Sequence, residues 1–157
     1  PVRKTVQGGL YQAMNYKKIY SMAITEIIKE HPLRIYLCDA ESYTLVLNNC
    51  CMCFLPKDKN IFALKPRELP DGFKRLLPKS KLVEVYRTDK ILDTKPKARL
   101  LETEDGKEYA YCIDNALLSC FDRNAEIKIN PNKEVSLFYT YENEKLVGII
   151  APIRRKK

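Results

Sequence analysis

A helix-like segment followed by three β-rich runs occurs twice in this sequence, and this repeated order restricts the fold more than any other feature. The first copy covers residues 11–55 and the second covers residues 114–153. Further β-rich runs link the copies, so we expect two helices and about eight strands. This mixture predicts an α+β fold in which both helices lie on one face of the sheet and the two halves are related by a pseudo-twofold axis.

The first helix is predicted by an amphipathic pattern between Tyr11 and Lys29. It ends before His31-Pro32, because the residue before a proline is pushed out of the helical region. Its expected buried face consists of apolar side chains at helical spacing, namely Tyr16, Tyr20, Ala23, Ile24, Ile27 and Ile28. The β-rich runs that follow it cover residues 33–37, 43–47 and 50–55.

Turn and cap residues mark the remaining elements. Asp105-Gly106, between runs at 98–104 and 107–113, is the strongest hairpin signal in the chain, and Asn48-Asn49 also tolerates positive φ. Asp114 is the expected N-cap of a second helix over Asn115–Phe121. Further strands are predicted at residues 81–87, 125–130, 135–141 and 145–153.

Positive charge is concentrated in two places. The chain has a net charge of +8, of which residues 56–99 carry +7 and residues 154–157 carry +4, whereas residues 100–153 carry −5. Four prolines and many Lys and Arg side chains indicate that residues 56–80 form a basic connector within a single domain of residues 1–157. A short helix is possible there at residues 72–77. Excess positive charge favours a polyanionic partner but does not identify a fold.

The six cysteines are expected to be reduced, buried strand thiols, with a metal site that includes His31 as the alternative. The sequence shows no signal peptide and no apolar run of about 18 residues, so we expect a cytoplasmic protein without a membrane partner. Nucleotide-binding, serine-hydrolase and zinc-protease motifs are absent. We therefore expect no enzymatic activity, no cofactor and no metal.

Two other groups have alternative interpretations. The acidic cluster at the Asp105-Gly106 hairpin is expected to be an exposed turn, although a metal-dependent nuclease could use such carboxylates. Tyr109 and Tyr111 share one sheet face, as do Tyr139 and Tyr141, which suits sheet packing or, alternatively, stacking on single-stranded bases.

Basic side chains are the stronger functional signal, because they can contact phosphates without reading the sequence. Lys17, Lys18 and Lys29 belong to or flank the first helix, and Arg123 follows the second. Lys74 and Arg75 represent the basic connector. These six residues are the candidate DNA-binding residues.

The C-terminal forty residues resemble a known family. A leucine-containing helix after Ile113-Asp114 leads to a strand at 125–129 and then to the sequence EKLVGIIAPIR, which ends at Arg154. This order resembles the last domain of bacterial DNA polymerase III β sliding clamps and their short phage and mobile-element relatives, which end near Met-Pro-Met/Val-Arg. Pro152 and Arg154 match that ending, whereas Ala151 and Ile153 replace its other positions and the chain continues for three basic residues.

The resemblance implies a sliding-clamp-like domain that binds duplex DNA non-specifically, as a replication processivity or accessory factor. In that family helices line the DNA-facing hole, which would place Lys17, Lys18, Lys29 and Arg123 toward DNA. The chain end borders a pocket for partner peptides of replication proteins, which here would involve Ile150, Pro152 and Arg154. A ring needs six such domains and hence a homo-oligomer. The alternative is a monomeric protein- or RNA-interaction module that uses the connector and tail. The net charge of +8 departs from the acidic balance of full clamps.

Overall fold

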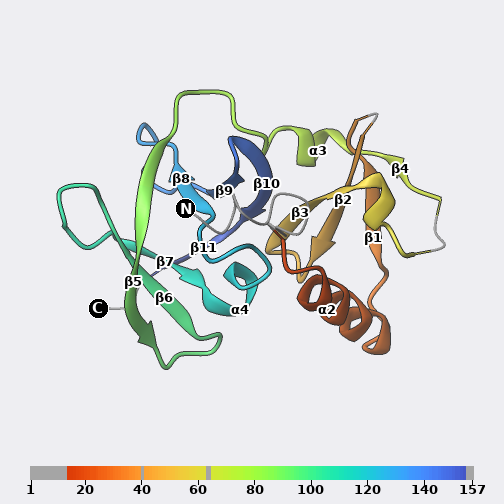
Figure 1. Cartoon of the computed structure of the whole chain (residues 1–157), viewed down its shortest axis with the longest axis horizontal. Coiled ribbons are helices and arrows are strands. Elements are labelled where there is room, and N and C mark those ends of the chain that lie inside the picture. Colours follow the sequence, from red (N-terminus) through yellow and green to blue (C-terminus); the bar gives the residue numbers. More distant parts are fainter. Residues whose placement is uncertain (1–13, 40, 63–64, 155–157) are drawn as a thin grey trace, which may run out of the picture.

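One large mixed β-sheet organises the protein, as seen in a computed structural model that describes residues 14–39, 41–62 and 65–154 (Figure 1). The fold is therefore α+β, as predicted. The helices are α2 (Tyr16–Ile28), α3 (Asp71–Lys74), α4 (Asn115–Leu118) and the 3-10 helix η1 (Lys57–Lys59). The expected helix start at Tyr11 and the basic tail at 155–157 lie outside the described residues.

The strands of this sheet follow the order β11-β7-β6-β5-β8-β9-β10-β3-β2-β1-β4. Within the described residues, β1 and β4 pair in parallel, and the other neighbouring strands pair antiparallel. Their bounds are β1 (Arg34–Leu37), β2 (Ser42–Leu47), β3 (Cys51–Pro56), β4 (Arg67–Glu68), β5 (Val83–Leu92), β6 (Ala98–Glu102), β7 (Tyr111–Asp114), β8 (Glu126–Ile129), β9 (Phe138–Glu142), β10 (Lys145–Ile150) and β11 (Pro152–Arg154).

The strand order is symmetric about the central pair formed by β3 and β10. On one side β3 is followed outward by β2 and β1, and on the other β10 is followed by β9 and β8. The central strands are antiparallel, with Gly148 opposite Cys53 and Ile150 opposite Cys51. Each half thus has the order of one helix and three strands that the sequence repeat predicts.

The C-terminal strand closes part of the sheet on itself. The sequence pattern predicts one strand over 145–153, but the chain bends at Ala151 and forms β10 and β11. β10 pairs with β3 and β9, whereas β11 pairs with β7, placing Ile153 opposite Cys112. Because β7, β6, β5, β8 and β9 connect β11 back to β10, these strands form a barrel.

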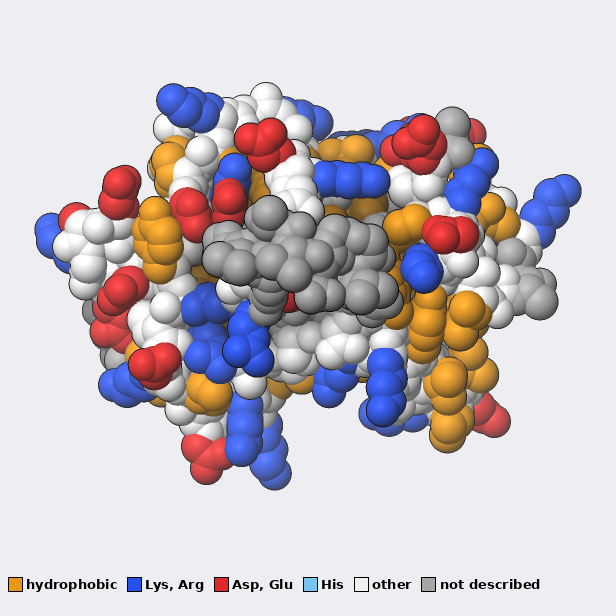
Figure 2. Space-filling view, viewed as in Figure 1, with side chains coloured by type: hydrophobic (Ala, Val, Ile, Leu, Met, Phe, Trp, Pro, Cys, Tyr) orange, Lys and Arg blue, Asp and Glu red, His pale blue; other side chains and the backbone are white. Residues whose placement is uncertain are grey.

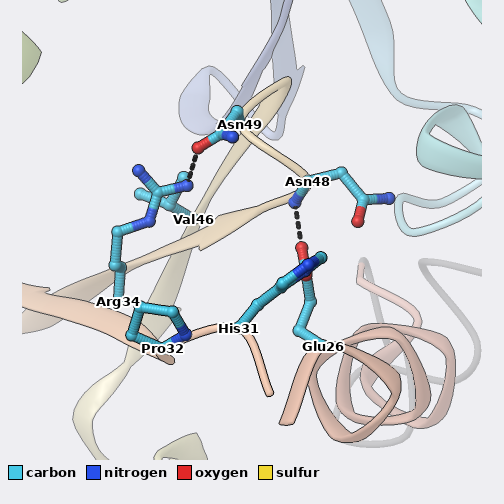
Figure 3. A pocket seen from close by; sticks show the side chains of 7 residues that line it. All are labelled: Glu26, His31, Pro32, Arg34, Val46, Asn48 and Asn49. Carbon is cyan, nitrogen blue, oxygen red and sulfur yellow. Dashed lines mark hydrogen bonds and ion pairs between the residues drawn. The ribbon is translucent and has the colours of Figure 1, made fainter. Parts of the chain in front are cut away.

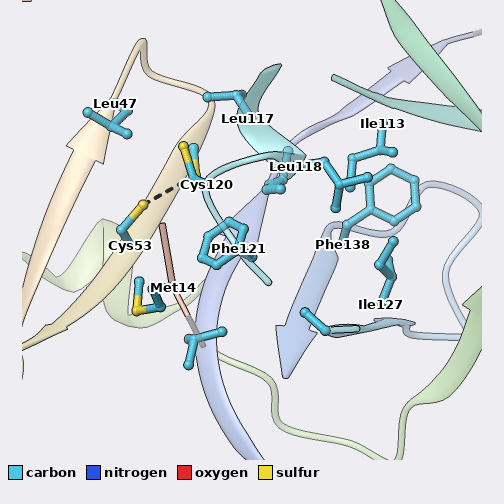
Figure 4. Packing of buried hydrophobic residues seen from close by; sticks show 14 of the residues in the cluster. Met14, Leu47, Cys53, Ile113, Leu117, Leu118, Cys120, Phe121, Ile127 and Phe138 are labelled. Carbon is cyan, nitrogen blue, oxygen red and sulfur yellow. Dashed lines mark hydrogen bonds between the residues drawn. The ribbon is translucent and has the colours of Figure 1, made fainter. Parts of the chain in front are cut away.

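Buried side chains form a core on each face of the sheet. The main core contains Ile19 of α2 and Leu117 of α4 together with Cys53 of β3, so both helices lie on the same face (Figure 4). The opposite face has a second core around Met52, against which Phe73, Leu76 and Leu77 pack. The connector also supplies Leu69, which is buried in this second core. Residues 56–80 are therefore more than a link between halves, because they cover one face of the sheet.

Helix α2 buries a narrower face than its sequence predicts. Asn15 caps the helix by accepting a hydrogen bond from the Lys18 N–H at 3.1 Å. Ile19 and Ala23 are buried, but the predicted core residues Ile24, Ile27 and Ile28 are 47%, 46% and 74% exposed. The prediction was wrong for these three isoleucines because the sheet contacts only the side of the helix that carries Ile19 and Ala23. No helix in the described part of the chain is long and apolar enough to cross a membrane.

Helix α4 begins as predicted and ends early. Asp114 caps it by accepting hydrogen bonds from the N–H groups of Ala116 and Leu117 at 2.9 and 3.2 Å. The helix covers Asn115–Leu118 rather than reaching Phe121, because Phe121 forms a β-bridge with Met14. The two predicted turns are confirmed: Asn48 and Asn49 have φ values of 52° and 57°, and Gly106 has a φ of 81°.

Candidate nucleic-acid interface and a neighbouring polar pocket

The start of α2 meets the segment that follows α4. The Asn15 N–H donates a hydrogen bond to the Cys120 carbonyl oxygen at 2.8 Å, and the neighbouring Met14 and Phe121 form a β-bridge. This contact joins the start of α2, which carries Lys17 and Lys18, to the segment between α4 and Arg123. Lys29 lies at the other end of the helix, roughly 16 Å away along its axis.

These four basic side chains are available to a ligand. Lys17, Lys29 and Arg123 are exposed and Lys18 is half-buried. None of the four forms an ion pair with another described residue. Burial raises the pKa of the Cys120 thiol, and the positive charge of Lys18 partly offsets that rise, which reflects the proximity of the two groups. Figure 2 shows Lys or Arg and hydrophobic side chains exposed side by side over the region of α2.

Lys74 and Arg75 belong to a different surface. They lie at the end of α3. The residues on either side of them in the chain, Phe73 and Leu76, pack on the sheet face opposite α2 and α4. The Lys74 Nζ is also 3.2 Å from Glu68 Oε1 and 3.8 Å from Asp71 Oδ1, so its charge is shared with two carboxylates. The six candidate DNA-binding residues therefore separate into a helix surface and an α3 surface.

The expected partner-peptide residues also separate. Ile150 is fully buried in the main core and cannot line an open pocket, which corrects the prediction for this residue. Pro152 and Arg154 lie on β11, where they are half-buried and exposed. A small cavity of about 90 Å³ lies beside β10 on the opposite face, and its lining includes Val46, Met52, Phe73, Leu76, Ile149 and Ala151. Successive side chains of a strand point to opposite faces, so Ile149 and Ala151 line this cavity whereas Ile150 does not.

A larger pocket of about 400 Å³ lies where the end of α2, the start of β1 and the turn between β2 and β3 meet (Figure 3). The His31 Nδ1 is 2.7 Å from Glu26 Oε2, and the Asn48 N–H donates to Glu26 Oε1 at 2.5 Å. On the other side of the pocket, Arg34 Nη2 donates a hydrogen bond to Asn49 Oδ1.

The charges of this pocket are well defined. The hydrogen bond from His31, assisted by the Asn48 N–H, lowers the pKa of Glu26, so this residue is a carboxylate at neutral pH. The Glu26 side chain is only 12% exposed, whereas that of His31 is 62% exposed. The sequence predicts neither the pair nor the pocket, because its residues come from three elements. A carboxylate five residues before the lone histidine is the one local signal.

The other chemical candidates are used in packing and turns. Tyr109 lies with its ring 5.9 Å from that of Tyr111 and 6.0 Å from that of Phe138, in contact with the main core. Tyr139 is buried in the second core, so both tyrosine pairs take part in sheet packing. Asp105 accepts hydrogen bonds from Thr103 and from the Lys107 N–H within its own turn, as an exposed hairpin predicts.

The cysteines are predominantly buried. Cys51, Cys53, Cys112 and Cys120 are buried, Cys38 is half-buried, and Cys50 is exposed. The Sγ atoms of Cys51 and Cys53 are 3.8 Å apart, and this contact together with burial raises the pKa of Cys51. Among the described residues, no group of three or more His, Cys, Asp and Glu side chains is arranged to hold a metal ion.

Comparison with known proteins adds no family assignment. No protein-family model, curated protein or solved structure matches this chain. The functional proposal therefore rests on the positions of the basic side chains and on the order of the elements.

Proposed function

We propose that this protein binds duplex DNA non-specifically through the basic surface formed by Lys17, Lys18, Lys29 and Arg123. The hydrogen bond between Asn15 and Cys120 carries the proposal, because it joins the start of α2 to the segment with Arg123. Phosphate oxygens can pair with these cations without first breaking an ion pair to another described residue. Such contacts are independent of base sequence.

The role we propose is that of a clamp-like, DNA-associated processivity or accessory factor without catalytic activity of its own. Three facts support it: the mirrored order of the strands about β3 and β10, the presence of α2 and α4 on one face, and basic residues on that helical side. The two halves are not equal, because α4 has a single turn whereas α2 has 13 residues. The barrel closed by β11 lies outside the repeat. A clamp-like ring requires several copies, so light scattering should return a defined oligomer rather than a monomer.

Salt dependence tests the DNA contact quantitatively. Four phosphate contacts predict that the logarithm of the binding constant falls with the logarithm of salt concentration with a slope of about −3.6. The double variant K18Q/K29Q should reduce the magnitude of this slope by roughly 1.8, and R123Q by about 0.9. The matched control K74Q/R75Q removes two positive charges from the opposite face and should leave the slope near the wild-type value.

Fluorescence anisotropy with a labelled duplex of arbitrary sequence measures these slopes. The proposal fails if the wild type does not bind or if its affinity is independent of salt. It also fails if K74Q/R75Q weakens binding as much as K18Q/K29Q does, because total charge rather than the α2 surface would then be responsible.

The cavity beside Ile149 favours a second candidate function, a monomeric module that binds an apolar peptide of a partner protein. Its lining includes Phe73 and Leu76 from the connector, so this candidate function uses apolar rather than charged side chains of that segment. This candidate would be favoured if light scattering gave the mass of a monomer and the protein did not bind DNA. A L76K variant should then lose affinity for an apolar peptide, whereas K18Q/K29Q should retain it.

A further inference from the structure

The polar pocket between α2, β1 and the β2–β3 turn is separate from the basic surface already described, and its chemistry suits an anion. Its two nitrogen-bearing side chains, Arg34 and His31, lie on opposite sides of the opening, and Val46 lies beside Arg34 (Figure 3). A volume of about 400 Å³ is within the range of small-ligand sites.

Existing hydrogen bonds hold both side chains in place while leaving donors unused. Arg34 gives one N–H to Asn49, and its other guanidinium N–H groups form no hydrogen bond with a described residue. His31 is held through Nδ1, and its Nε2 forms no hydrogen bond with a described residue either. A guanidinium fixed at one nitrogen retains the planar pair of donors that fits a phosphate.

The carboxylate in the pocket does not exclude an anion. Both oxygens of Glu26 already accept hydrogen bonds, one from Asn48 and one from His31. His31 donates from both ring nitrogens only in its imidazolium form, and in that form it balances the charge of Glu26 and leaves the positive charge of Arg34 in excess. The exposed neighbours Lys29 and Glu30 offset each other.

We propose that this pocket binds one phosphate group, with the Arg34 guanidinium and the His31 Nε2–H as its donors. The phosphate would belong to a nucleic-acid backbone that continues from Lys29, and this part of the inference rests on the proposed function. Asn49 acts as a positioning residue, because its side chain orients Arg34.

His31 is the only histidine in the chain, so its imidazole C–H signals in a proton NMR spectrum report on this pocket alone. Titration of the full chain with inorganic phosphate, at constant ionic strength and slightly acidic pH, should shift these signals in a saturable way. R34Q should weaken phosphate binding by about tenfold or more, since a charge-assisted bidentate contact is lost. R75Q, on the opposite face, should leave the titration unchanged.

N49G provides a second variant that keeps the turn, because glycine adopts the positive φ of this position without strain. It should weaken phosphate binding severalfold while the protein remains folded by far-ultraviolet circular dichroism. Absence of a saturable shift in the wild type would overturn the phosphate site. So would an equal response in folded R34Q and wild-type protein.

A duplex DNA titration separates this inference from the proposed function. DNA should move the same His31 signals in the wild type and not in R34Q. If DNA binds with the expected salt dependence but leaves His31 unaffected, the backbone is not the source of the phosphate. If inorganic phosphate binds and DNA does not, the proposed function fails while the phosphate site stands.

Discussion

Gly148 lies directly against the Phe121 ring, and replacing this glycine with alanine should destabilise the protein measurably. A Cβ atom at this position would lie 2.2 Å from Phe121 Cζ and 2.6 Å from Phe121 Cε1, well inside van der Waals contact. Phe121 is buried in the main core, so a shift of its ring disturbs the side chains packed around it (Figure 4). Overpacking of this kind costs about 1–3 kcal/mol. A chain of this length should then lose roughly 2–12 °C in melting temperature.

The double variant G148A/F121L isolates the cause. Leucine lacks the Cε1 and Cζ atoms that meet the new Cβ, so G148A should cost about 1 kcal/mol less in the F121L background than in the wild type. A remaining cost is expected from Thr140 Oγ1, which is 2.9 Å from the same Cβ. Urea unfolding of the four proteins gives the coupling free energy. Additive effects, or a G148A variant as stable as the wild type, would refute the steric argument.

Three further predictions concern the cap of α4, the Glu26–His31 pair and the thiols. D114A should lower the free energy of unfolding by about 1 kcal/mol because two N–H groups of α4 lose their acceptor, whereas D114N should retain most of it in urea denaturation. The pKa of Glu26 is lowered in the folded state, so its contribution to stability is present above an unfolded-state pKa of about 4.3 and is lost as pH falls through the lower folded value. The stability difference between wild type and E26Q should therefore shrink on acidification, and a difference that grows would contradict this sign. Native labelling with a thiol reagent should modify the exposed Cys50 first, slowly because partial desolvation of its sulfur and the nearby Asp114 raise its pKa, and C50S should lack that phase. Rapid native labelling of Cys53 or Cys112 would contradict their burial.

Features that depend on near neighbours in the chain were predictable. Asp114 caps α4 because a carboxylate before a helical turn finds free N–H groups two and three residues ahead. Asn48, Asn49 and Gly106 tolerate positive φ, and the chain turns at each of them. The end of α2 near His31-Pro32 follows from the backbone restriction that proline imposes.

The candidate sites were less predictable, because they depend on contacts between distant segments. Asn15, at the start of α2, contacts Cys120, three residues before Arg123, and no local pattern specifies this contact. Ile150 is an apolar residue near the chain end, where a peptide pocket was expected, but its side chain faces the core. The pairing of β10 with β3 decides which face of the sheet it occupies. The pair of Glu26 and His31 forms a pocket only after Arg34 and Asn49 are brought opposite to it.

The described residues form eleven strands, more than the eight or so that the sequence predicts. The order of the helix-and-strand repeat, the caps and turns, and the uneven distribution of charge could be read from the sequence alone. These follow from interactions within a few residues, which are the same wherever the segment lies. The exposure of Ile24, Ile27 and Ile28 of α2, and the pairing of β11 with β7, depend on the tertiary structure. Only it separated Lys74 from the helix lysines. The burial of a side chain and the pairing of a strand depend on which distant segments come into contact. Strand register and sheet closure determine these contacts, and both involve residues from the whole chain.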